Sequence, residues 1–372
     1  MAQLPSTTTT DRAHMIAALA LARRGLGETW PNPTVGCVLV KDGRVVGRGR
    51  TSPGGRPHAE IGALSQAGVD ARGATAYVTL EPCSHYGKTP PCADALIQAG
   101  IARAVVANPD PDPRVNGAGV GKLRTAGISV ELGLCGEEAA VINAGFFKRV
   151  REGSPLVTLK IASSLDGRIA TNDGKSRWIT GAPARTLVHL LRAENDAVLI
   201  GSGTATADNP ELTCRLPGLE GRSPLRIVLD SYLRLPLTAK LVATAEEIPT
   251  WILTRPDADA DRMDAFRQCG VDIIPIPPGR DGRIDLTAAF SVLGERGLTS
   301  ILVEGGGRMS AALFRERLVD RLAWFHAPMV LGGDGLPASV PFGVAKLSDA
   351  PRFTLLESRV IGNDILTLMT RE

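Results

Sequence analysis

Apolar and polar residues alternate in two different patterns along this chain. Residues 35–40 (VGCVLV) and several later stretches are continuous apolar runs rich in β-branched residues, which is typical of buried strands. Between these runs, as from Asp11 to Arg24, apolar residues recur every three or four positions, which predicts amphipathic helices. Strands that alternate with helices predict a layered α/β fold.

The first part of the chain predicts one complete α/β unit. A helix over residues 11–24 is closed by Gly25 and Gly27, and a hairpin then turns at Asp42-Gly43. We further expect helices near residues 58–68, 92–99, 120–126 and 137–148, and strands over 74–80, 102–108 and 128–134. The first ten residues (MAQLPSTTTT) lack this pattern and predict a disordered tail.

A polar segment with Gly and Pro, residues 151–157 (REGSPLV), follows the last of these helices and predicts a domain boundary. A second α/β series begins there. Its expected strands cover residues 156–162, 196–201, 225–230, 250–254, 271–276 and 300–306. We therefore expect two domains, residues 11–150 and residues 155–372.

Composition narrows the possible partners and the compartment. The chain has 372 residues, of which 44% are hydrophobic, and its net charge of +3 is too small for a nucleic-acid binding surface. No apolar run approaches the roughly 18 residues of a membrane helix, and the start has no secretory signal pattern. Six cysteines without an export signal favour a reducing, cytoplasmic location and free thiols at Cys37, Cys135, Cys214 and Cys269.

Cys83 and Cys92 differ from the other cysteines because of their neighbours. Cys83 follows an expected strand, Cys92 opens an expected helix, and His58 and Glu60 stand in the triplet HAE. One imidazole and two thiolates are ligands suited to Zn²⁺. A fourth coordination position can hold a water molecule, whose pKa falls to about 7 on catalytic zinc. Glu60 is then placed to move protons between this water and a substrate.

Two other interpretations of these cysteines remain open. They could form a disulfide, or His85 could be the fourth ligand of a closed structural zinc site. The pattern resembles the signature of zinc-dependent deaminases, H-x-E followed by P-C-x-x-C. Eight residues separate Cys83 from Cys92 here instead of two, which weakens the case for a nucleoside or RNA deaminase.

The segments PNPTVGCVLV, HAE, EPCSHYGKTPPC and VNGAG resemble the deaminase domain of the bifunctional riboflavin-biosynthesis deaminase/reductase family. This resemblance implies a cytidine-deaminase-like three-layer α/β/α domain that hydrolyses the 2-amino group of a diaminopyrimidinone ribosylamino phosphate. It also implies that His58, Cys83 and Cys92 bind zinc and that Glu60 is catalytic. Asn32 is a substrate contact or merely a turn residue between two prolines, and we expect SHYGKTPP to line the pocket.

In the second half, ILVEGGG is a strand that runs into a glycine-rich turn before the helix MSAALF. Backbone N–H groups at such a turn can bind phosphate, and Arg308 would add charge. The Rossmann fingerprint G-x-G-x-x-G is not matched, so a plain glycine turn remains an alternative.

The segments LKIASSLDGRIAT, SRWITG, GSGTATADNPELTCR and VEGGGRMSAAL resemble the reductase domain of the same family. The resemblance implies a dihydrofolate-reductase-like α/β domain that uses NADPH. The implied cofactor contacts are Ala162, Trp178, Thr204, Asp208, Gly306, Gly307, Arg308, Met309, Ser310, Ala311 and Ala312. The implied substrate contacts are Ser176, Arg192, Leu212, Arg215 and Glu304. Either arginine could instead be a solvated surface charge, Trp178 could be a core aromatic, and no residue is assigned as proton donor.

The sequence therefore predicts a cytoplasmic enzyme that deaminates a pyrimidine ribosyl phosphate with zinc and reduces its ribosyl group to ribityl with NADPH. We expect no nucleic-acid or membrane partner and a homo-oligomer, with a dimer favoured. One alternative is a tRNA or nucleoside zinc deaminase fused to an unrelated nucleotide-binding domain. Another is a non-catalytic zinc module fused to a nucleotide-binding regulator.

Overall fold

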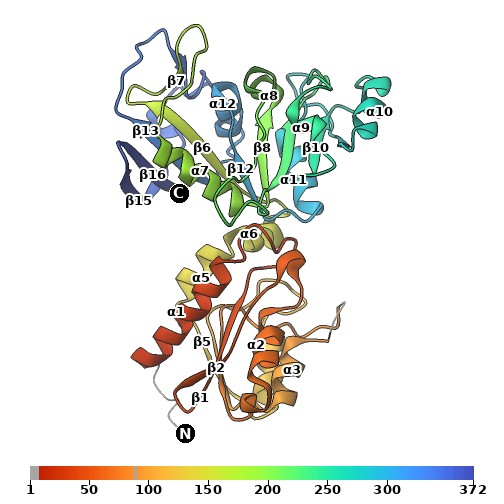
Figure 1. Ribbon diagram of the computed structural model, residues 1–372, viewed down its shortest axis with the longest axis vertical. Coiled ribbons are helices and arrows are strands. Elements are labelled where there is room, and N and C mark those ends of the chain that lie inside the picture. The colour runs from red at the N-terminus through yellow and green to blue at the C-terminus, as the bar shows by residue number, and fades with distance from the viewer. Residues whose placement is uncertain (1–7, 88–89) are drawn as a thin grey trace. The chain divides into compact units, whose positions relative to one another are not determined.

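The computed structural model describes residues 8–87 and 90–372 (Figure 1). The chain divides into two compact units between Gly153 and Ser154. Gly153 takes a left-handed conformation with φ 74° at the end of a helix, and Pro155 follows two residues later. A left-handed glycine and a nearby proline both stop a helix, so the division lies in the polar segment 151–157.

The first unit is built on a five-stranded sheet of order β2-β1-β3-β4-β5. Its strands are β1 (Gly36–Lys41), β2 (Arg44–Arg50), β3 (Thr75–Val78), β4 (Arg103–Val106) and β5 (Ser129–Leu132). The expected hairpin is present: β1 and β2 are antiparallel and turn at Asp42 and Gly43, which both have positive φ. The β3, β4 and β5 strands are parallel to one another.

Helices cover both faces of this sheet, as Figure 1 shows. They are α1 (Thr9–Arg23), α2 (Ala59–Ala67), α3 (Cys92–Ala99), α4 (Ala118–Thr125), α5 (Gly136–Ile142) and α6 (Ala144–Glu152). Alternate residues of β1 point to opposite faces: Cys37 and Leu39 join the core with α2 and α3, whereas Val38 and Val40 pack with α1. The expected three-layer α/β/α fold is therefore confirmed.

The expected single helix over residues 137–148 is wrong, because the helix breaks at Asn143. The Asn143 side chain is buried and makes two hydrogen bonds with the backbone of Thr34, accepting from N–H and donating to C=O, both at 3.0 Å. This pairing holds Asn143 outside helical geometry, so α5 ends and α6 begins there. A partner more than a hundred positions away decided the local structure.

The expected tail of ten residues is too long. Residues 1–7 lie outside the described part of the chain, but Thr8 is the N-cap of α1. The Thr8 hydroxyl accepts from the Asp11 N–H at 3.1 Å, and the Asp11 carboxylate accepts from the Thr8 N–H at 2.9 Å. This reciprocal capping box starts the helix at Thr9.

The second unit contains a nine-stranded sheet of order β11-β10-β9-β8-β12-β6-β13-β16-β15. Its strands are β6 (Leu156–Ser164), β8 (Ala197–Gly201), β9 (Leu225–Leu229), β10 (Thr250–Thr254), β11 (Asp272–Pro275), β12 (Ser300–Val303), β13 (Arg321–Ala327), β15 (Phe353–Ile361) and β16 (Asp364–Arg371). The seven strands from β11 to β13 are parallel, and β16 and β15 are antiparallel additions at one edge.

Helices and one small ribbon complete this unit. The helices are α7 (Ala182–Ala193), α8 (Ser202–Asp208), α9 (Lys240–Ala243), α10 (Ala260–Gln268), α11 (Leu286–Glu295) and α12 (Gly307–Arg315), and the ribbon pairs β7 (Arg168–Ala170) with β14 (Leu336–Pro337). All six strands expected from apolar runs are present, and the α/β class is confirmed. Among residues 8–87 and 90–372, no helix is long and apolar enough to span a bilayer.

Candidate functional site

The first unit contains a cavity of about 370 Å³, called here the first cavity, whose lining includes Asn32, His58, Glu60 and Cys83. Local structure places the chemistry: His58 is the N-cap of α2, Glu60 lies in its first turn, and Cys92 is the first residue of α3. Cys83 follows β3 through the short segment that holds Leu80. Residues from three separate segments therefore converge at one point.

His58, Cys83 and Cys92 form a compact ligand set, since their ligand atoms all lie within 4.8 Å of one another. His58 Nδ1 is 3.2 Å from Cys92 Sγ and 3.6 Å from Cys83 Sγ. The Cys92 backbone N–H donates to Cys83 Sγ at 3.2 Å. One nitrogen and two sulfur atoms at this spacing match the donor set of a catalytic zinc site, in which three protein ligands leave one position open.

The electrostatics of this cluster favour a bound cation. Hydrogen bonds from Cys92 and His58 outweigh burial and lower the pKa of the Cys83 thiol to about 4, so it is a thiolate. The hydrogen bond to Cys83 raises the pKa of Cys92, whose proton a cation would displace. Glu60 is 3% exposed, and burial raises its pKa to about 7, although the charge of His58 opposes that change. A carboxyl group with this pKa can both accept and release a proton near neutral pH.

The two alternative interpretations of the cysteines do not agree with this arrangement. Cys83 and Cys92 are free cysteines rather than a disulfide pair, as are the other four cysteines. His85 lies in the lining of the cavity but outside the group of three ligands, and its buried Nδ1 has no hydrogen-bond partner among residues 8–87 and 90–372. Within the described residues, the ligand set is therefore open on one side rather than closed by His85.

Asn32 lines the first cavity and contacts Gly55 closely. A Cβ atom on Gly55 would lie 1.9 Å from Asn32 Nδ2, and Gly55 has φ +82°, so a glycine is needed to hold this asparagine in place. His85, Tyr86 and Gly87 of the expected pocket segment also line the cavity. Lys88 and Thr89 of that segment lie outside the described residues.

The sequence analysis did not identify Glu81 and Asp110, which also line the first cavity. Glu81 accepts hydrogen bonds from the backbone N–H groups of Asp110, Gly117 and Val120 at 3.0–3.2 Å. It therefore fixes the loop that carries Asp110, whose pKa burial raises to about 6. In the sequence, Glu81 is marked only by its position two residues before Cys83. This position does not reveal the backbone N–H groups that its carboxylate binds.

The second unit contains a larger cavity of about 790 Å³, called here the second cavity. It brings together most of the expected reductase residues from distant parts of the chain. These are Ala162, Ser176, Trp178, Arg192, Thr204, Asp208, Leu212, Arg215, Glu304 and Gly306. Leu212 adopts φ 56°, so this non-glycine residue is held in a left-handed conformation at the cavity wall.

Glu304 is the buried anion of the second cavity. Arg192 donates through Nε to Glu304 Oε1 at 2.6 Å and through Nη2 to Oε2 at 3.0 Å. Lys160 Nζ lies 3.2 Å from the same Oε2 atom. Burial alone would raise the pKa of Glu304, but the charges of Arg192 and Lys160 lower it to about 2. Arg192 is therefore not a solvated surface charge, and Lys160 is a lining residue that the sequence analysis missed.

Trp178 is not a core aromatic, because 65% of its surface is exposed. The guanidinium of Arg185 lies 4.5 Å from the centre of its ring, which is a cation–π contact. Arg215 is half-exposed and forms an ion pair with Glu211 at 2.7 Å. Both residues line the second cavity with their side chains available to a ligand.

A third cavity of about 510 Å³ shares Gly203, Thr204 and Gly306 with the second cavity, so the two adjoin. Its lining includes Gly307, Arg308, Met309 and Ala312 of α12. A Cβ atom on Gly307 would lie 2.3 Å from the Pro337 carbonyl, so the turn needs glycine for close packing there. Ser310 and Ala311 are fully buried and line neither cavity, so their side chains lie in the core.

Two family models match different parts of the chain. The model described as "Cytidine and deoxycytidylate deaminase zinc-binding region" matches residues 8–108. The model described as "RibD C-terminal domain" matches residues 155–367. The matched ranges contain the zinc-type ligand set and the second cavity, respectively.

Known proteins resemble the chain over nearly its whole length. "Riboflavin biosynthesis protein RibD" of Escherichia coli is 44% identical over 366 residues, which is 95% of this chain and 98% of that protein. The protein of the same name from Aquifex aeolicus is 41% identical, with 97% and 98% covered.

Solved structures agree with these relatives. RibD of Acinetobacter baumannii (form 2) has a TM-score of 0.87 at 40% identity and covers 98% of this chain and 99% of its own. The diaminohydroxyphosphoribosylaminopyrimidine deaminase/5-amino-6-(5-phosphoribosylamino)uracil reductase of Thermotoga maritima has a TM-score of 0.85 at 35% identity, with 98% and 99% covered.

Proposed function

The chain belongs to the RibD family of riboflavin biosynthesis proteins, and on this premise we propose how its two units divide the work. It is a bifunctional enzyme, a hydrolytic deaminase and an NADPH-dependent reductase. It removes the 2-amino group of 2,5-diamino-6-ribosylamino-4(3H)-pyrimidinone 5′-phosphate and reduces the ribosyl group to ribityl. We assign the deaminase to residues 11–150 and the reductase to residues 155–372.

We assign zinc to His58, Cys83 and Cys92. The single observation that carries the deaminase assignment is that these three ligand atoms lie within 4.8 Å of one another beside buried Glu60. Zinc bound there would polarise a water molecule and lower its pKa. The protein supplies two sulfur ligands that offset the charge of the ion, and His58 offers Nδ1 as the third.

Glu60 is the proton carrier of the deamination. Water adds to the ring carbon that bears the 2-amino group, and ammonia leaves with one more proton than that group had. Glu60 accepts a proton from the water and delivers it to the departing nitrogen, which its pKa of about 7 allows in both directions. Asn32, held against Gly55 at the cavity wall, binds the pyrimidine.

The second and third cavities together hold the reductase ligands. We assign NADPH, which supplies the hydride, to Ala162, Trp178, Thr204, Asp208 and the cavity-lining residues Gly306, Gly307, Arg308, Met309 and Ala312; Ser310 and Ala311, which lie in the core, support this turn from behind. The ribosyl phosphate is assigned to Ser176, Arg192, Leu212, Arg215 and Glu304. Opening the ribosyl ring needs a proton on its oxygen as well as a hydride. Lys160, held by Glu304 inside the cavity, is our proposed donor of that proton.

Mass spectrometry of the products tests the assignment. The diaminopyrimidinone phosphate should lose its 2-amino group without NADPH and gain two hydrogens only when NADPH is added. Ammonia release without a reduced product, or reduction without ammonia release, would leave only one of the two activities in place. The RibD relatives match the chain across both halves, which sets aside the tRNA or nucleoside deaminase and the non-catalytic module.

A small-molecule substrate is the partner that the family activity requires. We further propose that the protein is a cytoplasmic homodimer without nucleic-acid or membrane partners. Six free thiols support a reducing compartment. Edge strand β15 exposes Leu355, Leu356 and Val360, and a second copy could cover this apolar edge. Light scattering at micromolar concentration should give twice the chain mass, and a monomer would refute the dimer.

A further inference from the structure

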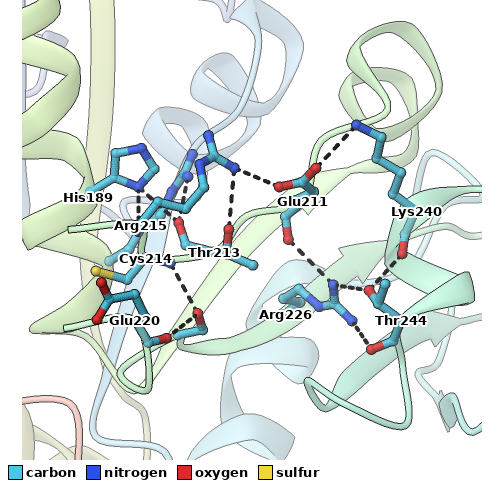
Figure 2. A network of polar contacts seen from close by, with 11 residues as sticks. His189, Glu211, Thr213, Cys214, Arg215, Glu220, Arg226, Lys240 and Thr244 are labelled. Carbon is cyan, nitrogen blue, oxygen red and sulfur yellow. Dashed lines mark hydrogen bonds and ion pairs between the residues drawn. The ribbon is translucent and has the colours of Figure 1, made fainter. Parts of the chain in front are cut away.

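One acidic side chain at the wall of the second cavity is held between two cations. Glu211 lies on the loop between α8 and β9, and Figure 2 shows Arg215 and Lys240 on either side of it. Arg215 Nη1 is 2.7 Å from Glu211 Oε2, and Lys240 Nζ is 3.2 Å from Oε1. All three residues line the second cavity, and their side chains are 41–57% exposed.

Arg226 fixes the backbone on which this group stands. Its side chain in β9 is fully buried, and it donates to the carbonyl oxygen of Glu211 at 3.4 Å. It also donates to the hydroxyl and carbonyl of Thr244 at 2.7 and 2.9 Å, next to α9, the helix that Lys240 begins (Figure 2). Because one rigid guanidinium binds both segments, it sets the distance between the Glu211 loop and α9.

A second pair of contacts orients the cations themselves. The backbone N–H of Lys240 donates to Asn209 Oδ1 at 2.9 Å, which ties the start of α9 to the same loop. The carbonyl of Thr213, between Glu211 and Arg215, accepts from Arg192 Nη1 at 3.0 Å. The backbone segments that carry Arg215 and Lys240 are therefore held in place by hydrogen bonds to the rest of the unit.

The other cations of the second cavity already have partners. Arg192 and Lys160 share the buried Glu304. Arg185 stacks on Trp178 and donates to the Thr180 carbonyl, and Arg177 donates to the Asp208 carbonyl. Burial lowers the pKa of His189, so this imidazole is neutral at pH 7 and adds no charge. Within the described residues, Arg215 and Lys240 remain as the half-exposed pair, and both form their ion pair with the exposed carboxylate of Glu211.

We propose that Lys240 binds the 5′-phosphate of the reductase substrate together with Arg215, and that Glu211 is the resident counterion that this phosphate displaces. A carboxylate that bridges two cations occupies the position that two phosphate oxygens would take. The phosphate carries more charge than a carboxylate and so competes successfully for both cations. The inference rests on the assignment of the second cavity to the reductase, and it adds two residues to that site.

Steady-state kinetics of Lys240→Met test the proposal. With NADPH and the deaminated ribosyl phosphate, KM should rise about tenfold while kcat changes less than about twofold, because a charge-assisted contact to a non-reacting group is lost. The KM of the dephosphorylated ribosyl compound should not respond. Lys240→Arg should retain most of the wild-type KM. Lys346→Met is the matched control, since exposed Lys346 lies outside the cavity lining.

Glu211→Gln tests the displacement. The neutral amide no longer competes for the cations, so inorganic phosphate should inhibit this variant about threefold more strongly than the wild type. Weaker or equal inhibition overturns the role of Glu211. An unchanged KM in Lys240→Met, or an equal rise for both substrates, overturns the role of Lys240. A wild-type protein that reduces neither substrate would instead refute the reductase assignment, so the two failures are distinguishable.

Discussion

The deaminase site and the reductase site differ in how far their functional side chains are buried. In the first cavity the ligand atoms lie within 4.8 Å of one another, and Glu60 and Cys92 are 3% and 1% exposed. The second cavity, at about 790 Å³, is more than twice the size and keeps Trp178, Arg215 and Lys240 largely open to solvent. Activating water requires a compact, desolvated cluster, whereas bringing a dinucleotide to a sugar requires a long cavity with polar anchors.

Removal of a metal ligand should have the largest effect, and this effect should be confined to the deaminase site. Cys92→Ser replaces a buried thiolate ligand with a hydroxyl, so bound zinc and ammonia release should both fall to background. Metal analysis and an ammonia assay measure this, with NADPH oxidation on deaminated substrate as the internal control. Cys269→Ser, a half-buried free thiol of the other unit, is the matched control. Full ammonia release by Cys92→Ser would contradict the ligand assignment.

Glu60→Gln should separate metal binding from proton transfer. The amide cannot carry a proton, so deamination should fall by about 10²–10⁴-fold while zinc content and reduction of deaminated substrate stay normal. The variant is compared with Glu137→Gln, which neutralises an exposed glutamate of the same unit. If Glu60→Gln releases ammonia at the wild-type rate, another group moves the proton and the contrast between the two sites weakens.

The second unit should lose stability in acid through Glu304. Its pKa of about 2 lies below the value near 4.5 of an unfolded glutamate, so its stabilisation is complete above pH 4.5 and is lost as pH falls toward 2. A shift of this size corresponds to about 3 kcal/mol. Fluorescence of Trp178, Trp251 and Trp324 follows this transition. Glu304→Gln should be less stable at pH 7 and less sensitive than the wild type to pH between 4.5 and 2, where Asp166 still titrates.

That experiment also tests whether the two units respond separately to acid. The first unit has its own ion pair, in which Arg103 lowers the pKa of Asp11 and donates to its carboxylate at 2.8 Å. Acid unfolding followed at Trp30 should therefore be the same in Glu304→Gln as in the wild type. A shift at Trp30 would show that the units do not unfold independently.

The smallest expected effect is at the start of the first unit. Thr8→Ala removes the hydroxyl that caps α1 and should lower the free energy of unfolding of that unit by about 1 kcal/mol. Urea unfolding monitored at Trp30 measures it, with Thr8→Ser as the control that keeps the hydroxyl. Neither activity should change by more than about twofold, and a larger loss would mean that α1 contributes to a site.

The contrast between the sites also explains what the sequence could predict. His58, Glu60, Cys83 and Cys92 stood out because His and Cys are rare in this chain and two short motifs contain all four residues. Their spacing predicted a zinc site before any distance was known. In the second unit, strands were predicted from apolar runs, but Lys160 was missed because only the fold brings it to Glu304.

The same reason explains the errors in secondary structure. The helix break at Asn143 depends on its pairing with the Thr34 backbone, which no local pattern contains. The strands β7, β13, β14, β15 and β16 were not predicted, and β15 in particular is largely exposed and lacks a buried apolar run. The start of α1 could have been predicted, because Thr8 and Asp11 have the spacing of a capping box. Local rules thus suffice where the partners are near in the chain.

The chain passes from one unit to the other only once, between Gly153 and Ser154. In the part of the chain that the structure describes, each sheet is therefore made from one stretch of sequence, and no strand comes from the other half. A gene cut at this point would encode two polypeptides, each with a whole sheet and a whole cavity. Duplication, loss or replacement of one unit thus requires a single genetic junction, and the same junction is where an engineer would divide the chain.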